Sequence, residues 1–462
     1  MYRDSKPVSL EIVILAAGSG RRMQSALPKV LHRIGGKPML AHVLETAEAL
    51  RPSAIHIVEG SEGALLHEAF PKHMSWVKQE RPEGTGHAVQ CALPYIHEEA
   101  RVLVLYGDVP LITQDTLKCL IEKTPDALGA LLVNMPNPQG FGRVIRNKEG
   151  FIMDVVEERD LKDAQKQISD IFTGILLAPK ALLATYLPTL DNHNAQQEYY
   201  LTQLFSKVAA SQQYPIVEMH TENLFEVAGV NDLFQLNVLE RHYQERQAKK
   251  LLQAGVTLMD YRRFDLRGTI DAAPNVTIDV DVIFEGTNTV GQGSRIGPYC
   301  LIKNATIGEN VIIHAHSVID GAEIESFCQV GPFARLRKGT HLKSYAKIGN
   351  FVETKKSTIG SSSKVNHLSY IGDAHIGSDV NIGAGTITCN YDGVHKYPTF
   401  IEDGAFIGSG TQLVAPMRVG KNATIGAGTT LRKDAPADTL TCNDTRQRSL
   451  PGWKRTVKPL PE

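Results

Sequence analysis

Cysteine is scarce in this sequence, with six among 462 residues. The six are scattered, with no CxxC pair and no histidine at zinc-ligand spacing, which argues against a zinc site. We therefore expect reduced thiols, as in a cytoplasmic protein.

An excess of charge of one sign is also missing. Lysine and arginine number 49 against 50 aspartates and glutamates, a formal net charge of −1. Such a balance gives no reason to expect a nucleic acid or an anionic membrane as partner. Any phosphate site must therefore be local.

Long hydrophobic runs are missing as well. The most apolar early stretch, 10–17, contains Glu11 and is too short to span a bilayer. The N-terminal segment leads into a glycine loop and not into a small-residue cleavage site. We therefore expect a cytoplasmic protein without membrane insertion.

The first half of the chain, 1–231, alternates between two patterns. Apolar runs at 11–15, 55–58 and 102–106 are typical of strands, and helical segments such as 39–50 and 85–93 lie between them. This alternation predicts an α/β domain with a mainly parallel sheet. Ligands of such sheets bind beyond the carboxyl ends of the strands.

A charged segment without glycine or proline follows at 232–254. Its partial apolar stripe predicts one linking helix. Asp232 is a candidate cap for its start and Gly255 for its end.

The segment 255–441 carries an internal repeat in which aliphatic residues recur every six positions. Clear examples are Ile324, Val330, Leu336, Leu342 and Ile348, and later Ile401, Ile407, Leu413, Val419, Ile425 and Leu431. A period of six predicts a hexapeptide β-solenoid in which each aliphatic points into the coil. A C-terminal tail, 442–462, follows.

Two breaks interrupt this repeat, a small one around 354–357 and a larger one at 389–399. The larger reads CNYDGVHKYPT. Because loops mounted on rigid scaffolds tend to carry function, we expect this loop to belong to a site.

The first glycine-rich motif, 15–23, reads LAAGSGRRM and directly follows a predicted strand. Its backbone amides can approach a nucleotide, but Met23 stands where a dinucleotide fingerprint requires glycine. Taken alone, this motif is also explained by a tight turn whose basic side chains face solvent. With LPK at 27–29 and GKPM at 36–39, the segment resembles the signature of sugar-phosphate uridylyl- and adenylyltransferases.

Further motifs extend this resemblance: Gln79, EGTGHA at 83–88 and LYGDVP at 105–110. With the hexapeptide zone, the whole chain resembles the family of bacterial bifunctional enzymes with N-acetylglucosamine-1-phosphate uridyltransferase and glucosamine-1-phosphate N-acetyltransferase activities. The resemblance implies an α/β fold: a Rossmann-like nucleotidyltransferase domain followed by a hexapeptide-repeat left-handed parallel β-helix. It also implies a homotrimer that makes UDP-N-acetylglucosamine.

The resemblance assigns the residues that surround UTP and the sugar. For the nucleotide and its phosphates it implies Leu15, Ala16, Ala17, Gly18 and Lys29, with Gln79, Gly84 and Thr85 at the uracil. Around the sugar it implies Tyr106, Gly107, Gly142 and Glu157, and for Mg²⁺ it implies Asp108 and Asn231. A carboxylate at a strand end suits Mg²⁺, which takes oxygen ligands, but a turn former also explains Asp108. A cap of the linking helix also explains Asn231.

In the repeat, acetyl transfer to an amino sugar needs a base that titrates near neutrality, because the ammonium must first lose a proton. By resemblance His367, within KVNHLSYIGD at 364–373, is that base. The implied acceptor site is Arg337, Lys355, Tyr370, Asn381 and Lys396. The implied acetyl-CoA contacts are Ala384, Asn390, Tyr391, Ser409 and Ala427. Without the resemblance, a solvated solenoid surface would explain Arg337 and Lys355 better.

The sequence departs from the family pattern at two positions. Phe172 stands where the family has an asparagine that touches the sugar, so we expect relaxed discrimination among hexose phosphates. Asp444 stands where the family has an arginine that reaches the coenzyme, and Arg446 and Arg448 are candidate substitutes.

Two alternatives stay open at this point. One is a monofunctional nucleotidyltransferase whose solenoid serves assembly or regulation, and the other is a sugar-nucleotide-binding scaffold with degenerate sites. The presence of His367 beside the 389–399 loop disfavours the first. The presence of Lys29, Asp108 and His367 together disfavours the second.

Overall fold

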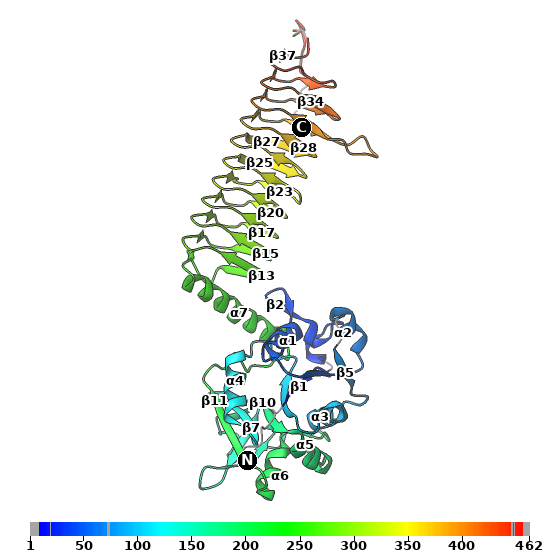
Figure 1. The fold of residues 1–462 in the computed structure, drawn as a ribbon, viewed down its shortest axis with the longest axis vertical. Helices are drawn as coiled ribbons and strands as arrows, with labels where there is room; N and C mark the ends of the chain where they lie inside the picture. The colour runs from blue at the N-terminus through cyan, green and yellow to red at the C-terminus, as the bar shows by residue number, and fades with distance from the viewer. Residues whose placement is uncertain (1–8, 19, 72–73, 445–446, 448, 456–462) are drawn as a thin grey trace, which may run out of the picture. The chain divides into compact units, whose positions relative to one another are not determined.

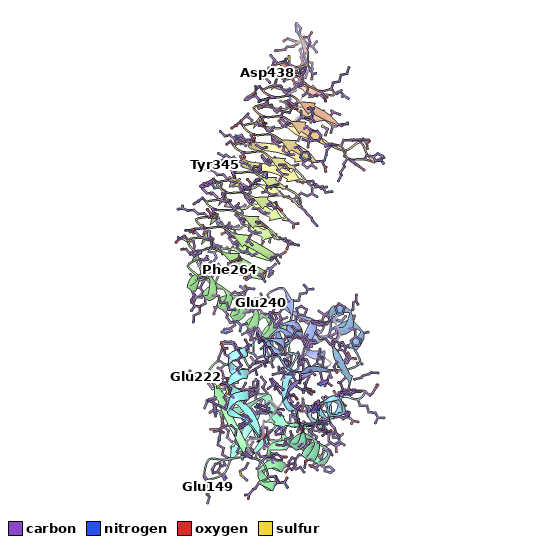
Figure 2. All side chains as sticks on the ribbon, viewed as in Figure 1. Glu149, Glu222, Glu240, Phe264, Tyr345 and Asp438 are labelled. Carbon is purple, nitrogen blue, oxygen red and sulfur yellow. The ribbon has the colours of Figure 1, made fainter. Side chains whose placement is uncertain are left out.

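The computed structural model describes residues 9–18, 20–71, 74–444, 447 and 449–455. The chain forms two compact units, Met1–Arg246 and Gln247–Glu462, and Figure 2 shows the side chains of each on the ribbon. Among the described residues, no helix has the length and apolarity needed to cross a membrane.

The first unit is built on one mixed sheet. Its strands lie in the order β11 (Ile216–Thr221), β7 (Leu128–Asn134), β10 (Asp170–Pro179), β6 (Arg101–Tyr106), β1 (Leu10–Leu15), β4 (Ala54–Glu59) and β5 (Ser75–Lys78). The pairs are parallel as predicted, except that β10 runs antiparallel to both of its neighbours. An antiparallel hairpin, β8 (Gly142–Arg146) and β9 (Ile152–Val156), extends from β10. The sequence did not predict the direction of β10, because an apolar run has the same pattern in either direction.

Helices cover both faces of this sheet. They are α1 (Met39–Ala49), α2 (Gly63–Ala69), α3 (Thr85–Ala92), α4 (Gln114–Lys123), α5 (Lys180–Tyr186) and α6 (Gln203–Ser211). Side chains of β1 alternate between two cores, with Val13 in one and Ile12 and Ile14 in the other. Burial on both faces explains why the strands read as continuous apolar runs.

Helix α7 (Leu233–Gln253) links the two units. The Asp232 side chain accepts a hydrogen bond from the Gln235 amide at 2.8 Å, so Asp232 caps the helix as predicted. Gly255 has φ +88°, which suits a glycine after a helix end. Asn231 does not cap this helix, because its side-chain oxygen instead accepts hydrogen bonds from Arg22 and Lys29.

The second unit is a parallel β-helix, which Figure 1 shows as a stack of coils. Its longest strands are β13 (Phe264–Ala272), β15 (Val282–Val290), β25 (Lys347–Lys355) and β27 (Lys364–Gly372), and its other strands have two or three residues each. Most strands pair in register with residues 17 or 18 positions further on, as in Ile307↔Ile324 and Ile283↔Leu301. Pairs that span the 389–399 loop are 25 residues apart, as in Ile382↔Ile407. The aliphatics of the predicted repeat, from Val290 to Leu431, are all at most 5% exposed. This confirms the predicted hexapeptide solenoid.

The two breaks in the repeat differ. The predicted break at 354–357 is no insertion, because Thr354 fills the inward position with no exposed surface and hydrogen bonds to Thr340 at 3.0 Å. The sequence suggested a break here because a polar residue occupies an inward position that aliphatic residues fill elsewhere in the repeat. The 389–399 loop is a true insertion between β30 (Ile387–Cys389) and β31 (Thr399–Ile401), and Figure 1 shows it leaving the stack as an arm.

Candidate functional sites

The carboxyl ends of β1, β5 and β6 surround a cavity of about 320 Å³ in the first unit. It is lined by Leu15, Ala16, Ala17, Gly18, Lys29, Val30, Gln79, Pro82, Gly84, Thr85, Ala88, Tyr106, Asp108 and Glu198. The cavity thus gathers the predicted uracil residues, the glycine-rich motif and Lys29. The predicted residues Gly107, Gly142, Glu157 and Asn231 are not among its lining.

Charged groups meet at one end of this cavity. The Lys29 ammonium forms an ion pair with the Asp108 carboxylate, and it lies 3.5 Å from the side-chain oxygen of Asn231. The Arg22 guanidinium donates to that same Asn231 oxygen at 2.8 Å. The structure therefore brings the two predicted metal ligands together around one cationic group.

These two oxygens suit a magnesium ion. They lie close enough to contact a single cation, as Lys29 demonstrates. The described residues hold no group of three or more His, Cys, Asp or Glu arranged for a metal. Mg²⁺ fits a site with few protein ligands, because it keeps several waters and binds substrate phosphates.

Of the predicted sugar residues, Tyr106 lines the cavity, and Gly142 and Glu157 lie near it. Burial, with the nearby carboxylates of Glu157 and Asp108, raises the pKa of Tyr106. Burial also raises the pKa of Glu157, whose carboxylate accepts a hydrogen bond from Thr202 at 3.1 Å. A Cβ at Gly142 would lie 3.2 Å from Val155 Cγ1 and 3.6 Å from that carboxylate, so Gly142 lies beside Glu157. Tyr106, Gly142 and Glu157 therefore form one neighbourhood.

Phe172 points into the protein core. It is buried and packs edge-to-face on Phe205, with ring centroids 4.9 Å apart. It does not line the cavity. The structure thus gives this position a packing role that the sequence did not indicate.

Sequence reasoning missed several residues of this site. Arg22, whose side chain contacts Asn231, lies within the glycine-rich motif. Its position close to Lys29 along the sequence could have indicated that it belongs to this site. Glu198 and Pro82 line the cavity from loops that carry no motif. Burial raises the pKa of Glu198.

In the second unit, His367 is exposed on β27, and its side chain is oriented by a neighbour. Its Nδ1 lies 2.9 Å from the side-chain oxygen of Asn350, one coil earlier in the same register. An amide oxygen only accepts, so Nδ1 carries the proton and Nε2 is left as the basic nitrogen. Sequence reasoning missed Asn350, although the 17-residue spacing of the coils was available to find it.

The column that holds His367 continues through the predicted coenzyme residues. The amide of Gly410 donates to the carbonyl of Ala384, and the amide of Gly428 donates to that of Ser409, each at 2.7 Å. Ala384, Ser409 and Ala427 therefore stand at equivalent positions on successive coils. They form a row of small side chains beyond His367.

Three predicted cationic residues gather near one another. The Lys396 ammonium lowers the pKa of Lys355, and Arg337 adds to that effect. Arg337 itself donates to the Glu353 carboxylate at 2.7 Å. Because Lys396 lies on the 389–399 arm, the arm supplies a side chain to this cluster.

The base of the arm is held by polar contacts. The Asn390 amide nitrogen donates to the Asp373 carboxylate at 2.5 Å. A Cβ at Gly372 would lie 2.4 Å from the Tyr370 hydroxyl oxygen and 2.8 Å from Asn390 Nδ2, so only glycine admits this approach. Tyr370 and Asn390 are thus brought together.

The remaining predicted residues of this unit are less closely placed. Asn381 pairs in register with Lys364, at the start of the strand that bears His367, and Tyr391 is exposed on the arm. Asp444 is exposed. Arg446 and Arg448 lie outside the described residues.

Family models match both units. Residues 12–146 match a MobA-like NTP transferase domain. Residues 289–321 match a bacterial transferase hexapeptide model of six repeats, and residues 398–433 match a hexapeptide repeat of succinyl-transferase.

Curated relatives match almost the whole chain. A bifunctional protein GlmU of Alkalilimnicola ehrlichii is 51% identical over 454 residues, which cover 97% of this chain and 96% of the relative. Proteins of the same name from Legionella pneumophila and Herminiimonas arsenicoxydans are 50% and 49% identical, over 98% and 97% of this chain and 99% of each relative.

Proposed function

The chain belongs to the family of bifunctional GlmU proteins and carries a uridyltransferase and an acetyltransferase activity; from this premise we propose how its residues divide the work. The repeat unit transfers acetyl from acetyl-CoA to glucosamine-1-phosphate. The first unit then transfers uridylyl from UTP to N-acetylglucosamine-1-phosphate and releases pyrophosphate. The product, UDP-N-acetylglucosamine, serves cell-wall, peptidoglycan and lipopolysaccharide precursors.

In the first unit, the residues bind and orient two phosphorylated substrates. The glycine-rich motif, with Gln79, holds UTP so that the sugar-phosphate oxygen attacks the α-phosphorus and pyrophosphate leaves. Lys29 neutralises charge on the phosphates, and its position at the cavity end supports that role. Tyr106, Gly107, Gly142 and Glu157 surround the sugar.

Asp108 and Asn231 would hold Mg²⁺ in this unit. When bound, the ion supplies charge neutralisation on the transferring phosphates. The proximity of both oxygens to the Lys29 ammonium supports this assignment.

In the repeat unit, His367 Nε2 accepts a proton from the amino group of the sugar. The nitrogen can then attack the acetyl thioester, and coenzyme A leaves as the thiol. The hydrogen bond from Nδ1 to Asn350, which leaves Nε2 basic, is the observation that carries the proposal. Arg337, Lys355 and Lys396 neutralise the acceptor phosphate, with Tyr370 and Asn381 beside them. Ala384, Asn390, Tyr391, Ser409 and Ala427 contact acetyl-CoA.

A homotrimer completes the acetyl sites between copies of the chain. An exposed aromatic corner next to the His367 column supports such packing. Rings of Tyr299, His316, Phe333 and Phe351 stack along it with centroids 4.9–5.4 Å apart, and exposed Leu368 continues the row. The number three and the cytoplasmic location come from the family alone.

One incubation tests the proposal. The protein is mixed with glucosamine-1-phosphate, acetyl-CoA, UTP and Mg²⁺, and free thiol, pyrophosphate and UDP-N-acetylglucosamine are followed separately. All three are expected. Pyrophosphate formed from supplied N-acetylglucosamine-1-phosphate without any thiol release would favour the monofunctional alternative.

A further inference from the structure

A histidine outside the predicted site contacts the side chain proposed to bind the uracil base. His87 lies on α3, and its Nδ1 is 3.2 Å from the side-chain nitrogen of Gln79. Gln79 follows β5, lines the cavity and is 6% exposed. His87 itself does not line the cavity, so it touches the nucleotide site only through Gln79.

The orientation of the Gln79 amide follows from its two partners. Its nitrogen donates to the carbonyl oxygen of Gly84 at 3.1 Å, and that oxygen only accepts. With His87 Nδ1 as the second acceptor, both amide hydrogens are used. The Gln79 carbonyl oxygen is then the atom left for a ligand in the cavity.

The Cys91 contact of His87 is consistent with this arrangement. If Nδ1 accepts, the ring proton is on Nε2, which lies 3.6 Å from the Cys91 sulfur. The Glu83 carboxylate lies 3.8 Å from Nδ1, too far for a hydrogen bond, and the Tyr199 ring lies beside the imidazole at a centroid distance of 6.5 Å. His87 is thus held by α3 and by the loop that carries Tyr199.

An exposed amide oxygen distinguishes uracil from cytosine. Uracil presents N3–H, a donor, at its pairing edge, whereas cytosine presents an unprotonated N3 acceptor and an amino group. A fixed Gln79 oxygen accepts from uracil N3–H and repels cytosine N3. A rotated amide would present its NH₂ group to the base and lose that preference.

We propose that His87 is a positioning residue that locks the Gln79 amide and thereby sets the preference of the enzyme for uracil over cytosine nucleotides. The proposal rests on the proposed role of Gln79 at the base. With His87 removed, the single bond to Gly84 no longer holds both amide hydrogens, and the amide can turn.

The test compares kcat/KM for UTP and for CTP in the full-length enzyme. His87→Leu, which has no acceptor, is expected to lower the UTP/CTP ratio about tenfold, the size of one well-placed hydrogen bond. KM for UTP should rise while kcat is kept, because the reacting phosphates are untouched. His87→Asn, whose side-chain oxygen falls near the position of Nδ1, is expected to restore the ratio.

Two controls separate this inference from simpler explanations. The side chain of His87→Gln places its polar end near the position of Nε2, so this variant should lower the UTP/CTP ratio as His87→Leu does. It replaces His87→Leu in the test if the leucine variant does not fold. Cys91→Ala removes the contact at Nε2 and should leave the ratio unchanged.

The outcomes that overturn the proposal are distinct. An unchanged ratio in folded His87→Leu, with a collapsed ratio in Gln79→Leu, would remove His87 and keep the proposed base site. An unchanged ratio in Gln79→Leu would remove the role of Gln79 itself. Equal losses of kcat in His87→Leu and His87→Asn would reduce His87 to a packing role.

Discussion

In the repeat unit, Asn350, His367 and Ala384 stand on successive coils, so one spacing along the chain relates neighbouring residues of the proposed site. In the first unit, Lys29, Asp108 and Asn231 meet although they lie up to 202 residues apart in sequence. A solenoid contacts mainly its nearest neighbours, so its surface can be read from its period. A sheet site is assembled by topology, because loops from non-consecutive strands converge at one edge.

The difference also concerns what each site requires. The proposed sheet site has two oxygen ligands and cations that suit phosphates, whereas the proposed repeat site has a base and a row of small side chains. The two chemistries should therefore fail independently. The following experiments test that independence, beginning with the largest expected effect.

Removal of metal should separate the two activities completely. EDTA is expected to abolish pyrophosphate release, because Asp108 and Asn231 would lose the ion that neutralises the phosphates. Acetyl transfer should continue, and added Mg²⁺ should restore the first activity. Parallel assays of thiol and pyrophosphate measure this, and an equal collapse of both activities would contradict the separation of the two sites.

Substitution of the proposed base should separate them in the opposite sense. His367→Ala is expected to slow thiol release by about 10²–10⁴-fold, the usual contribution of a general base, with uridylyl transfer kept. Asp108→Ala should do the reverse.

His375→Ala is the matched control for this variant. His375 stacks on Phe400 in the same unit, with ring centroids 5.1 Å apart, and lies outside the proposed site. A folded His367→Ala protein that acetylates at the wild-type rate would disprove the general-base role.

Two substitutions of Asn350 test whether this side chain orients His367 on the next coil. Asn350→Leu is expected to reduce acetyl transfer by about tenfold, because the imidazole loses the bond that selects its tautomer. Asn350→Asp keeps an acceptor and adds negative charge, which favours the protonated ring, so the acidic limb of the pH–rate profile should move to higher pH. An unshifted profile with Asp would show that the two side chains do not interact in solution.

The smallest effect concerns the cationic cluster. Lys396 lowers the pKa of Lys355, so the Lys355 ammonium loses its proton at a lower pH than an ordinary lysine. The affinity for the acceptor phosphate should therefore begin to weaken at a lower pH than it would with an ordinary lysine. Lys396→Met removes the neighbouring charge, raises that pKa and should move the alkaline rise in KM to higher pH, although KM itself increases. A rise that stays at its wild-type pH would place the arm away from Lys355.

Local patterns determined much of this protein. The six-residue period predicted the coils and their inward aliphatics, because in a solenoid the side-chain direction depends only on position in the repeat. The six-residue period did not predict that Thr354 points inward, because threonine is polar and its buried hydrogen bond to Thr340 is not visible in the sequence. The glycine-rich motif and the strand runs likewise indicated where a nucleotide would bind.

The sequence by itself determined the two folds, the solenoid register and the family to which the chain belongs, because each depends on residues close together along the chain. Only the tertiary structure decided that β10 runs antiparallel, that Phe172 packs on Phe205, and that His87 reaches the Gln79 amide. These features depend on which distant segments become neighbours. Local periodicity and propensity carry no record of that choice, which follows from how the sheet and its helices bury their apolar faces together.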